Sequence, residues 1–267
     1  MKTVPEQMHI LDTICRNKRL EIAVQKESTS LSTLKNSLKY PLREKISFKK
    51  ALSGSKSGII AEFKRKSPSK GWINRDADAA RIVRSYEEAG AAAISCLTDE
   101  TFFGGSFDDF SKAREVIAGI PLLRKDFILD EYQLYQSKLM GADVVLLIAA
   151  CLTAEDIARF TAIAHALDME ALLEIHDESE LASICADVDV IGINNRNLKT
   201  FVTDIRHTIE LSSRIPEHFL KISESGLSRP ETVIQLRQAG FRGFLMGENF
   251  MKTNNPGESL REFIRML

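Results

Sequence analysis

Residues 58–71 read GIIAEFKRKSPSKG, and this stretch decides how the rest of the chain is interpreted. Its first half is an apolar run typical of a buried β-strand, and its second half is charged and rich in turn-forming residues. Side chains alternate between the faces of a strand, so Glu62 and Lys64 are expected on the same side. A carboxylate and an ammonium at the end of a buried strand are costly unless they pair or bind something. The stretch predicts either a functional strand end or a solvated one that carries surface charge.

The change from an apolar run to a polar ending recurs along the chain. The predicted strands are Gly58–Phe63, Ala92–Leu97, Ile120–Arg124, Asp143–Ala149, Met169–Ile175, Val188–Asn194, Phe219–Ser223 and Gly243–Gly247. The helical patterns between and after them are Arg75–Ala89, Asp108–Ile117, Glu131–Leu139, Ala154–Leu167, Glu178–Cys185, Asp204–Ser213, Pro230–Gln238 and Gly257–Met266. Near-continuous apolar strands indicate a parallel sheet covered by helices. Eight strand–helix units with short loops predict an α/β fold, a (β/α)8 TIM barrel. A doubly wound open sheet is the alternative, but no GxGxxG sequence follows the first strand.

The residues before this pattern, 1–47, are expected to form a helical extension packed on a barrel domain of residues 48–267, in one domain overall. One helix is predicted between Pro5 and Lys26 and a second, shorter one from the leucines of residues 31–38. The polar segment Ser47–Ser57 is expected to be a connector into the first strand.

Composition excludes several classes of protein. The chain has 267 residues and a net charge of −1, so nothing global suggests a nucleic-acid or membrane surface. The longest apolar run, Val144–Leu152, is too short to span a bilayer, and the charged N-terminus is unlike a signal peptide. The four cysteines show no metal-ligand spacing, and thiols in a reducing cytoplasm are the preferred interpretation. We expect a cytoplasmic protein with no metal, no nucleic-acid or membrane partner, and a monomeric state or a weak dimer.

A TIM barrel carries its chemistry at the carboxyl ends of its strands. The residues at these ends, most of them polar or charged, are Glu62, Lys64, Thr98, Lys125, Glu174, Asn194, Glu224, Ser225, Gly247 and Glu248. Their recurrence predicts a shared active site. Glycines in the last two endings, Gly226 and Gly247, either offer backbone N–H groups to a phosphate or only make tight turns. Basic residues at the same end, namely Lys64, Arg65, Lys66, Lys70, Arg124, Lys125 and Arg196, predict a positive mouth that favours an anionic substrate.

Seven motifs occur in order at these strand ends: AEFKRKSPSKG, LTDETFFGGS, LLRKDFI, LLEIHDE, GINNRNL, SESGL and FLMGENFM. With them, and with the helical N-terminus, nearly the whole chain resembles the indole-3-glycerol phosphate synthase family. The chain departs from the family pattern at Glu131, where proline is expected, and at the pair Gly104-Gly105.

The resemblance implies an enzyme of tryptophan biosynthesis, a carboxy-lyase without a cofactor. It closes the ring of 1-(2-carboxyphenylamino)-1-deoxyribulose 5-phosphate, with loss of carbon dioxide and water, to give indole-3-glycerol phosphate. Lys125 matches the general acid of the family, and Glu174 and Lys64 match positions that serve dehydration, although which lysine acts at which step stays open. Glu62 and Asn194 would orient these groups.

The resemblance also implies how the anionic phosphosugar is bound. Phosphate would be held by the backbone of Gly226 and Gly247-Glu248, with Lys64 and Ser67 nearby; Glu224, Ser225 and Arg196 would lie near the substrate. A salt bridge at the rim is the alternative for Arg196. His176 is left out of the predicted site, because a lone histidine after a strand is more often a hydrogen-bond donor in a loop. Trp72 and Phe102–Phe103 could form an apolar wall for the aryl ring, or pack beneath loops.

Two other functions are compatible with a barrel. A related phosphosugar barrel, such as the isomerase of phosphoribosylanthranilate, would use an Asp and a Cys at strand ends and has no role for two lysines. A barrel without activity, used for binding or assembly, would have lost charge at one or more strand ends, and here every expected charge is present.

Overall fold

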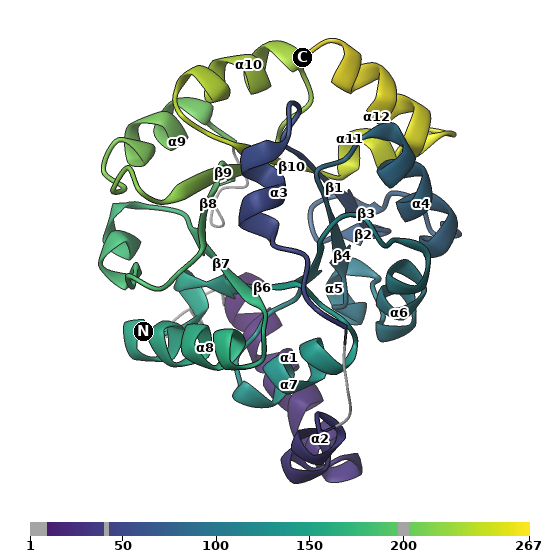
Figure 1. Ribbon diagram of the computed structural model, residues 1–267, viewed down its shortest axis with the longest axis vertical. Coiled ribbons are helices and arrows are strands. Elements are labelled where there is room, and N and C mark those ends of the chain that lie inside the picture. Colours follow the sequence, from purple (N-terminus) through teal and green to yellow (C-terminus); the bar gives the residue numbers. More distant parts are fainter. Residues whose placement is uncertain (1–9, 40–42, 197–202) are drawn as a thin grey trace, which may run out of the picture.

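The computed structural model describes residues 10–39, 43–196 and 203–267, and within them the strands close into a barrel. All neighbours in the order β1-β10-β9-β8-β7-β6-β5-β4 are parallel, and β1 pairs with β4 to close the ring. The strands are β1 (Ile59–Phe63), β4 (Ala93–Leu97), β5 (Leu122–Lys125), β6 (Val144–Ile148), β7 (Glu170–Ile175), β8 (Val190–Asn194), β9 (Leu220–Glu224) and β10 (Gly243–Met246). Helices surround this ring (Figure 1). The predicted TIM barrel is confirmed.

The outer helices agree closely with the predicted ones. They are α4 (Ala79–Ala89), α6 (Phe107–Val116), α7 (Glu131–Leu139), α8 (Ala154–Ala166), α9 (Ile205–Ser212), α10 (Pro230–Gln238) and α12 (Pro256–Arg265). Helix α4 starts four residues later than expected, because the Asp78 side chain caps it by accepting from the Arg81 N–H at 2.7 Å. The segment predicted as a helix at Glu178–Cys185 is a short 3₁₀ helix, η2 (Glu178–Ser183).

The ends of four barrel strands lead into small elements near the mouth of the barrel. Strands β2 (Lys66–Ser67) and β3 (Gly71–Trp72) form a two-stranded antiparallel sheet in the loop after β1. Helix α5 (Glu100–Phe103) follows β4, the 3₁₀ helix η1 (Ala149–Cys151) follows β6, and α11 (Glu248–Met251) follows β10.

The prediction of a polar connector at Ser47–Ser57 is wrong in part, because this segment contains a helix, α3 (Phe48–Gly54). Ser47 caps this helix, and Phe48 and Leu52, one turn apart, are both buried on one side. They pack against the apolar side chains that fill the inside of the barrel, such as Ile60 and Leu123. Helix α3 lies across the ring in Figure 1, at the end where the strands begin. It closes the bottom of the barrel and leaves the opposite end open.

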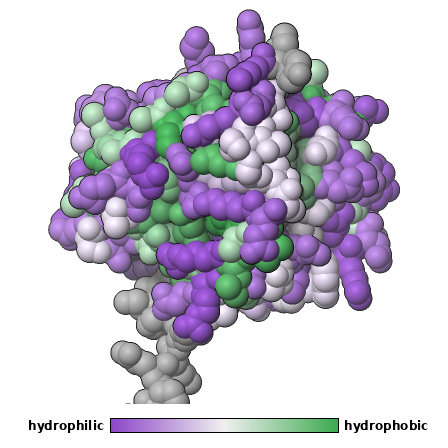
Figure 2. Space-filling model, turned by 90° about the horizontal axis from the view of Figure 1, so that it is seen from below, coloured by the Kyte–Doolittle hydropathy of each residue, from purple (hydrophilic) through white to green (hydrophobic). Residues whose placement is uncertain are grey.

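Two helices precede α3, and both lie against α7 (Figure 1). They are α1 (Ile10–Ser28) and α2 (Leu31–Ser37); residues 5–9 of the predicted first helix lie outside the described residues. Ile22 of α1 and Leu34 of α2 pack with Tyr132 of α7. The Tyr132 hydroxyl donates to the Thr29 carbonyl at 2.9 Å. Seen from below, most of the surface is hydrophilic, with hydrophobic side chains between the polar ones (Figure 2). Within the described ranges, no helix combines the length and apolarity needed to cross a membrane.

Candidate active site

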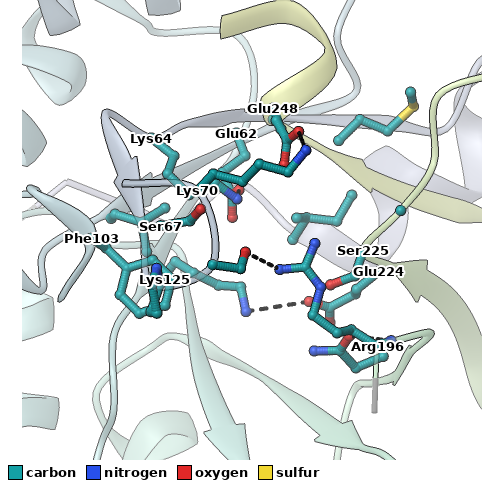
Figure 3. A pocket seen from close by; sticks show the side chains of 18 of the residues that line it. Glu62, Lys64, Ser67, Lys70, Phe103, Lys125, Arg196, Glu224, Ser225 and Glu248 are labelled. Atoms are coloured by element: carbon teal, nitrogen blue, oxygen red, sulfur yellow. Dashed lines mark hydrogen bonds and ion pairs between the residues drawn. The ribbon is translucent and has the colours of Figure 1, made fainter. Parts of the chain in front are cut away.

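A pocket of about 480 Å³ lies at the carboxyl ends of the strands. This volume suits a small molecule. All twelve residues predicted for the site line it: Glu62, Lys64, Ser67, Lys125, Glu174, Asn194, Arg196, Glu224, Ser225, Gly226, Gly247 and Glu248. They come from the ends of β1, β5, β7, β8, β9 and β10 and from the segments that follow these strands. Figure 3 shows the labelled ones among them around one common space. The predicted strand endings therefore meet in space, as expected for a barrel.

Lys125 lies at the floor of the pocket between two buried carboxylates. Its Nζ is 2.9 Å from Glu174 Oε2 and 3.3 Å from Glu224 Oε2. The other oxygen of Glu174 accepts from Asn194 Nδ2 at 3.1 Å. Both glutamates are almost fully buried, and 15% of the Lys125 side chain is exposed. The ammonium is thus fixed in place and open to the pocket.

The charges of this group depend on one another. Burial alone would lower the pKa of Lys125, but the negative charges of Glu174 and Glu224 outweigh it and raise that pKa. Burial alone would raise the pKa of Glu174, but Lys125 and His176 hold it well below its ordinary value. Burial, opposed by Lys125 and reinforced by the charge of Glu174, raises the pKa of Glu224 to about 8. At neutral pH the floor therefore holds an ammonium, a carboxylate and a protonated carboxylic acid.

A second charged pair lies beside the first. Glu62 and Lys64 project from the same side of the chain at the end of β1, and Lys64 Nζ donates to Glu62 Oε2. Gly247, at the end of β10, leaves room for this carboxylate. A Cβ atom at Gly247 would come within 2.6 Å of Glu62 Oε2. Phosphate binding and a tight turn were the two roles predicted for this glycine. The structure adds a third reason for a residue without a side chain here, the close packing of Glu62.

The loop after β9 has an unusual backbone. Ser225 and Gly226 both have φ of +71°, which is rare for serine. Asn195, which was not predicted as a site residue, supports this loop: its Nδ2 donates to the Ser225 carbonyl at 2.7 Å and its Oδ1 accepts from the Thr208 hydroxyl at 2.5 Å. Its position after the strand-end Asn194 is the only sequence signal for it.

Three polar atoms that line the pocket lack a partner. Ser67 Oγ, Arg196 Nε and Glu224 Oε1 are buried without a hydrogen-bond partner among the described residues. Buried polar atoms are normally paired, so unpaired ones in a pocket are consistent with a polar ligand. Arg196 also donates through Nη1 to Ser69 Oγ at 3.2 Å, rather than to a carboxylate at the rim.

Four of the seven basic residues expected to make the mouth locally positive line the pocket, and three do not. Arg65 pairs with Asp109 of α6, Lys66 donates to the Thr101 carbonyl, and the buried Arg124 contacts Asp126 and α7. Arg124 precedes Lys125 on a strand, and so points out of the barrel where Lys125 points in. The pocket is lined by the cations Lys64, Lys70, Lys125, Arg196 and Lys252 and by the carboxylates Glu62, Asp126, Glu174, Glu224 and Glu248, five of each. The carboxylates of the floor are buried, whereas the Lys70 side chain at the rim is 60% exposed.

One side of the pocket is apolar. Phe103 lines it, 6.0 Å from the ring of Phe127. Trp72 does not line it: this ring is 49% exposed and lies near Lys66 and Arg75. Helix α1 adds Ile10, Leu11 and Ile14 to the apolar wall, and none of these three was among the predicted site residues.

Helix α1 is attached to the site by a buried charge. Lys18 is 1% exposed, and its Nζ lies 3.0 Å from Asp126 and 3.1 Å from Asp99. Asp126 directly follows Lys125 and lines the pocket. One turn earlier, Cys15 Sγ lies 3.4 Å from Cys151 Sγ, and both are free thiols. The first helix therefore contacts the loop that begins directly after Lys125, the last residue of β5.

His176, excluded from the predicted site, contacts it. Its Nε2 lies 3.1 Å from Glu174 Oε1, on the side away from Lys125, and its Nδ1 lies 3.3 Å from Glu180 Oε2. The side chain is 9% exposed. The sequence signal was the spacing: two residues after Glu174, the histidine side chain falls on the same side of the chain.

Comparison with known proteins assigns the chain to a family. Residues 11–263 match the family model described as indole-3-glycerol phosphate synthase. A protein of that name from Bacteroides thetaiotaomicron is 52% identical over 258 residues, which cover 97% of this chain and 98% of the relative. Another, from Lachnoclostridium phytofermentans, is 39% identical and covers 98% of this chain and 94% of the relative.

A solved structure, of the tryptophan synthase a2b2 complex from Pyrococcus furiosus, shares the fold. It aligns with a TM-score of 0.58 and 14% identity, over 79% of this chain and 97% of that one. Such a low identity supports the barrel and nothing finer. The match to the family model over nearly the whole length, together with the close relatives, is decisive: the chain belongs to the indole-3-glycerol phosphate synthase family.

Proposed function

We propose that this protein converts 1-(2-carboxyphenylamino)-1-deoxyribulose 5-phosphate to indole-3-glycerol phosphate, with loss of carbon dioxide and water, as a step of tryptophan biosynthesis. The observation that carries the proposal is the Lys125 ammonium, held between Glu174 and Glu224 at the floor of a pocket with one apolar side. Family membership supplies the reaction, and this arrangement suits it.

Ring closure needs an electrophilic ketone. Lys125 donates a hydrogen bond or proton to the ketone oxygen, while the anilino nitrogen pushes electrons into the ring and the ring carbon that bears the carboxylate attacks. The new carbon–carbon bond leaves a hydroxyl on the former ketone carbon. Loss of carbon dioxide returns its bonding pair to the ring.

Dehydration then completes the indole. Glu174 accepts a proton from the methylene carbon between the anilino nitrogen and the former ketone carbon, and the C–H bonding pair forms the new double bond. A lysine protonates the departing hydroxyl, which leaves as water. Lys64 is placed for this task by Glu62, and Asn194 holds Glu174 in orientation. Protein groups suffice for every proton transfer, and the proposal includes no metal or other cofactor.

The substrate spans both sides of the pocket. We place its aryl ring against Phe103 and the apolar residues of α1, and its phosphate at the loops of Gly226 and Gly247-Glu248. Ser67, Arg196 and Ser225 lie beside that position, with the unpaired atoms of Ser67 and Arg196 available to phosphate oxygens.

The remaining proposals concern the whole protein. Residues 1–47 act as an extension that narrows the mouth, on a barrel of residues 48–267. The protein works in the cytoplasm as a monomer, with a weak dimer as the alternative, on a small anionic substrate and without nucleic acid. An absorbance or fluorescence assay for indole formation from the carboxyphenylamino substrate tests the function. Product that carries the indole spectrum, with one carbon dioxide released per turnover, is the expected result.

The related isomerase is distinguished by the same assay. Its acid–base pair would include a cysteine, and among the described residues no cysteine lines the pocket. Failure to form indole from the synthase substrate, with turnover of phosphoribosylanthranilate instead, would overturn the proposal.

A further inference from the structure

The two carboxylates that share Lys125 have different surroundings. Glu174 accepts a hydrogen bond from Lys125 on one oxygen and from Asn194, at 3.1 Å, on the other. The Nε2 atom of His176 lies 3.1 Å from this second oxygen, at ion-pair distance but without hydrogen-bond geometry. Glu224 has Lys125 on one oxygen at 3.3 Å, and its other oxygen is unpartnered. Two like charges that meet one ammonium in a buried site cannot both ionise cheaply.

The second oxygen of Glu224 is enclosed, and the Glu224 carboxyl also interacts with the carboxyl of Glu174. This second oxygen lies over Gly192 of β8, where a Cβ atom would come within 2.3 Å of it. The Leu172 side chain lies at the same place. Burial and the nearby charge of Glu174 make a second carboxylate costly there, whereas a neutral carboxylic acid is tolerated.

Glu174 has a second cation beside it, His176, in addition to the Lys125 that it shares with Glu224. The histidine lies behind Glu174, out of the pocket, and is held on its far side by Glu180, which also accepts from the His176 backbone N–H at 2.7 Å. The imidazole is thus clamped between two glutamates from β7 and η2. Asn194, a neutral amide, cannot supply the charge.

We propose that His176 is a positioning residue that keeps the negative charge on Glu174. Of the two carboxyl groups beside Lys125, Glu224 is then the one that carries a proton. The proposal rests on the proposed function, because it assigns Glu174 the task of a base. A base must be ionised before substrate arrives, and a cation behind it secures this without occupying the pocket.

The protonation of these groups agrees with their geometry. Burial opposes charging of the imidazole, but Glu174 and Glu180 outweigh it and raise the pKa of His176 to about 10, from an ordinary value of 6.5. The other titratable groups around it are Asp177, next in the chain, Cys151 of η1, near the same two glutamates, and His207, whose Nε2 lies 3.0 Å from the His176 carbonyl. Histidine therefore stays charged across the neutral range, and Glu174 stays ionised.

The test is a double-mutant cycle read through kcat. His176→Gln keeps a polar side chain at this position but removes the charge, so the proton on Glu224 is free to move to Glu174. We expect kcat at pH 7 to fall about tenfold, the equivalent of one pKa unit, with KM within twofold. In the Glu224→Gln background there is no second carboxyl group from which a proton could move to Glu174. There the His176→Gln substitution should lower kcat less than twofold. A purely structural role for His176 would cost the same in both backgrounds and would overturn the proposal.

A matched control is available on α8. His165 also contacts a carboxylate, with its Nε2 2.8 Å from Asp189, and it lies outside the pocket. His165→Gln should leave kcat within twofold in both backgrounds. A loss equal to that of His176→Gln would show that any histidine–carboxylate pair has this effect.

An NMR titration of the histidine ring signals gives a readout that needs no turnover. The His176 ring, assigned in the wild-type protein through its backbone resonances, should stay protonated past pH 8, and Glu174→Gln should lower its midpoint by at least one unit. A midpoint near 6.5 that Glu174→Gln does not move would overturn the proposal even if His176→Gln fails to fold. If the wild type titrates as expected but forms no indole, the proposed function fails and the charge assignment stands.

Discussion

Lys125 is the residue on which the proposed chemistry depends most directly. It is the ammonium at the floor of the pocket, and the two glutamates fix its position. Lys125→Met removes the acid, so we expect kcat to fall by about 10²–10⁴-fold or more while the barrel stays folded. Steady-state kinetics and circular dichroism measure both effects. Lys112→Met is the control, because Lys112 pairs with Asp108 on the exposed surface of α6. A Lys125→Met enzyme that retains a third of the wild-type rate would refute the assignment.

Glu224 should control activity at alkaline pH. Its pKa of about 8 means that it is neutral below this pH and becomes an anion above it. The new negative charge at the floor repels an anionic substrate, so kcat/KM of the wild type should fall as pH rises through about 8. Glu224→Gln cannot ionise and should lack this alkaline limb, whatever its effect on the maximum. The pH profile of kcat/KM for both proteins is the measurement, and an identical limb in the variant would assign it to another group.

At this scale the sequence predicts which residues meet but not how their charges pair. Strand ends could be located because apolar runs stop abruptly, and in a barrel they must converge. The alternation of a strand separates Lys125, which faces inward, from Arg124, but that separation depends on the exact register of β5. The partner of Arg65, Asp109, lies on a helix more than forty residues away, and no local pattern indicates it. Counting positive residues near the mouth therefore overestimated its charge.

Helix α1 is the element that joins the N-terminal segment to the chemistry. Lys18 anchors it through two buried carboxylates, one of which directly follows Lys125. Lys18→Met leaves these carboxylates without their cation and should destabilise the protein by about 3–5 kcal/mol. Loosening α1 should also raise KM at least tenfold, because α1 forms part of the apolar wall.

The same helix offers the control for Lys18. Lys26 pairs with Asp130, but 40% of the Lys26 side chain is exposed, and such pairs contribute about 0–1 kcal/mol. Lys26→Met should therefore change neither Tm nor KM appreciably. Thermal melts and steady-state kinetics compare the two variants. A Lys18→Met protein that melts earlier but keeps the wild-type KM would show that the anchor serves stability alone.

Helix α3 closes the other end of the barrel and should matter for stability only. Phe48 is fully buried against the barrel interior, so Phe48→Ala should cost about 3–5 kcal/mol of unfolding free energy. Denaturant titration measures this loss. At temperatures where the variant stays folded, kcat should be within twofold of wild type, because the bottom of a TIM barrel does not carry its chemistry. A large loss of kcat in folded protein would contradict this division.

The elements differ in how readily they could be predicted. Outer helices with clear start signals were located to the residue, such as α7, which Asp130 caps, and α10, which begins with a proline. Helix α3 was missed because seven residues with only Phe48 and Leu52 buried give little periodicity, and its polar remainder resembles a loop. Its helical state depends on the barrel interior that receives those two side chains.

The two ends of the barrel have different roles: the bottom contributes to stability, and the mouth forms the binding pocket. The bottom is filled by apolar side chains and α3, whereas the mouth gathers buried carboxylates, cations and unpaired polar atoms. The near-zero net charge of the chain gives no sign of this concentration. Periodicity alone could predict the barrel, but the pocket could be predicted only by combining the barrel with the residues at its strand ends.

Inorganic phosphate should compete with the substrate at the mouth, and two serines of one loop test where it binds. Ser67 Oγ is buried in the pocket without a partner, whereas the exposed Ser69 Oγ already accepts from Arg196. A hydrogen bond to a charged group contributes about 1.5–3 kcal/mol, so Ser67→Ala should raise the inhibition constant of phosphate roughly ten- to hundredfold. Ser69→Ala should change it less than threefold. Competitive inhibition by phosphate, measured for the wild type and both variants at constant ionic strength, decides the matter. Equal inhibition constants in all three proteins would place the phosphate away from Ser67, and the proposed orientation of the substrate would then be wrong.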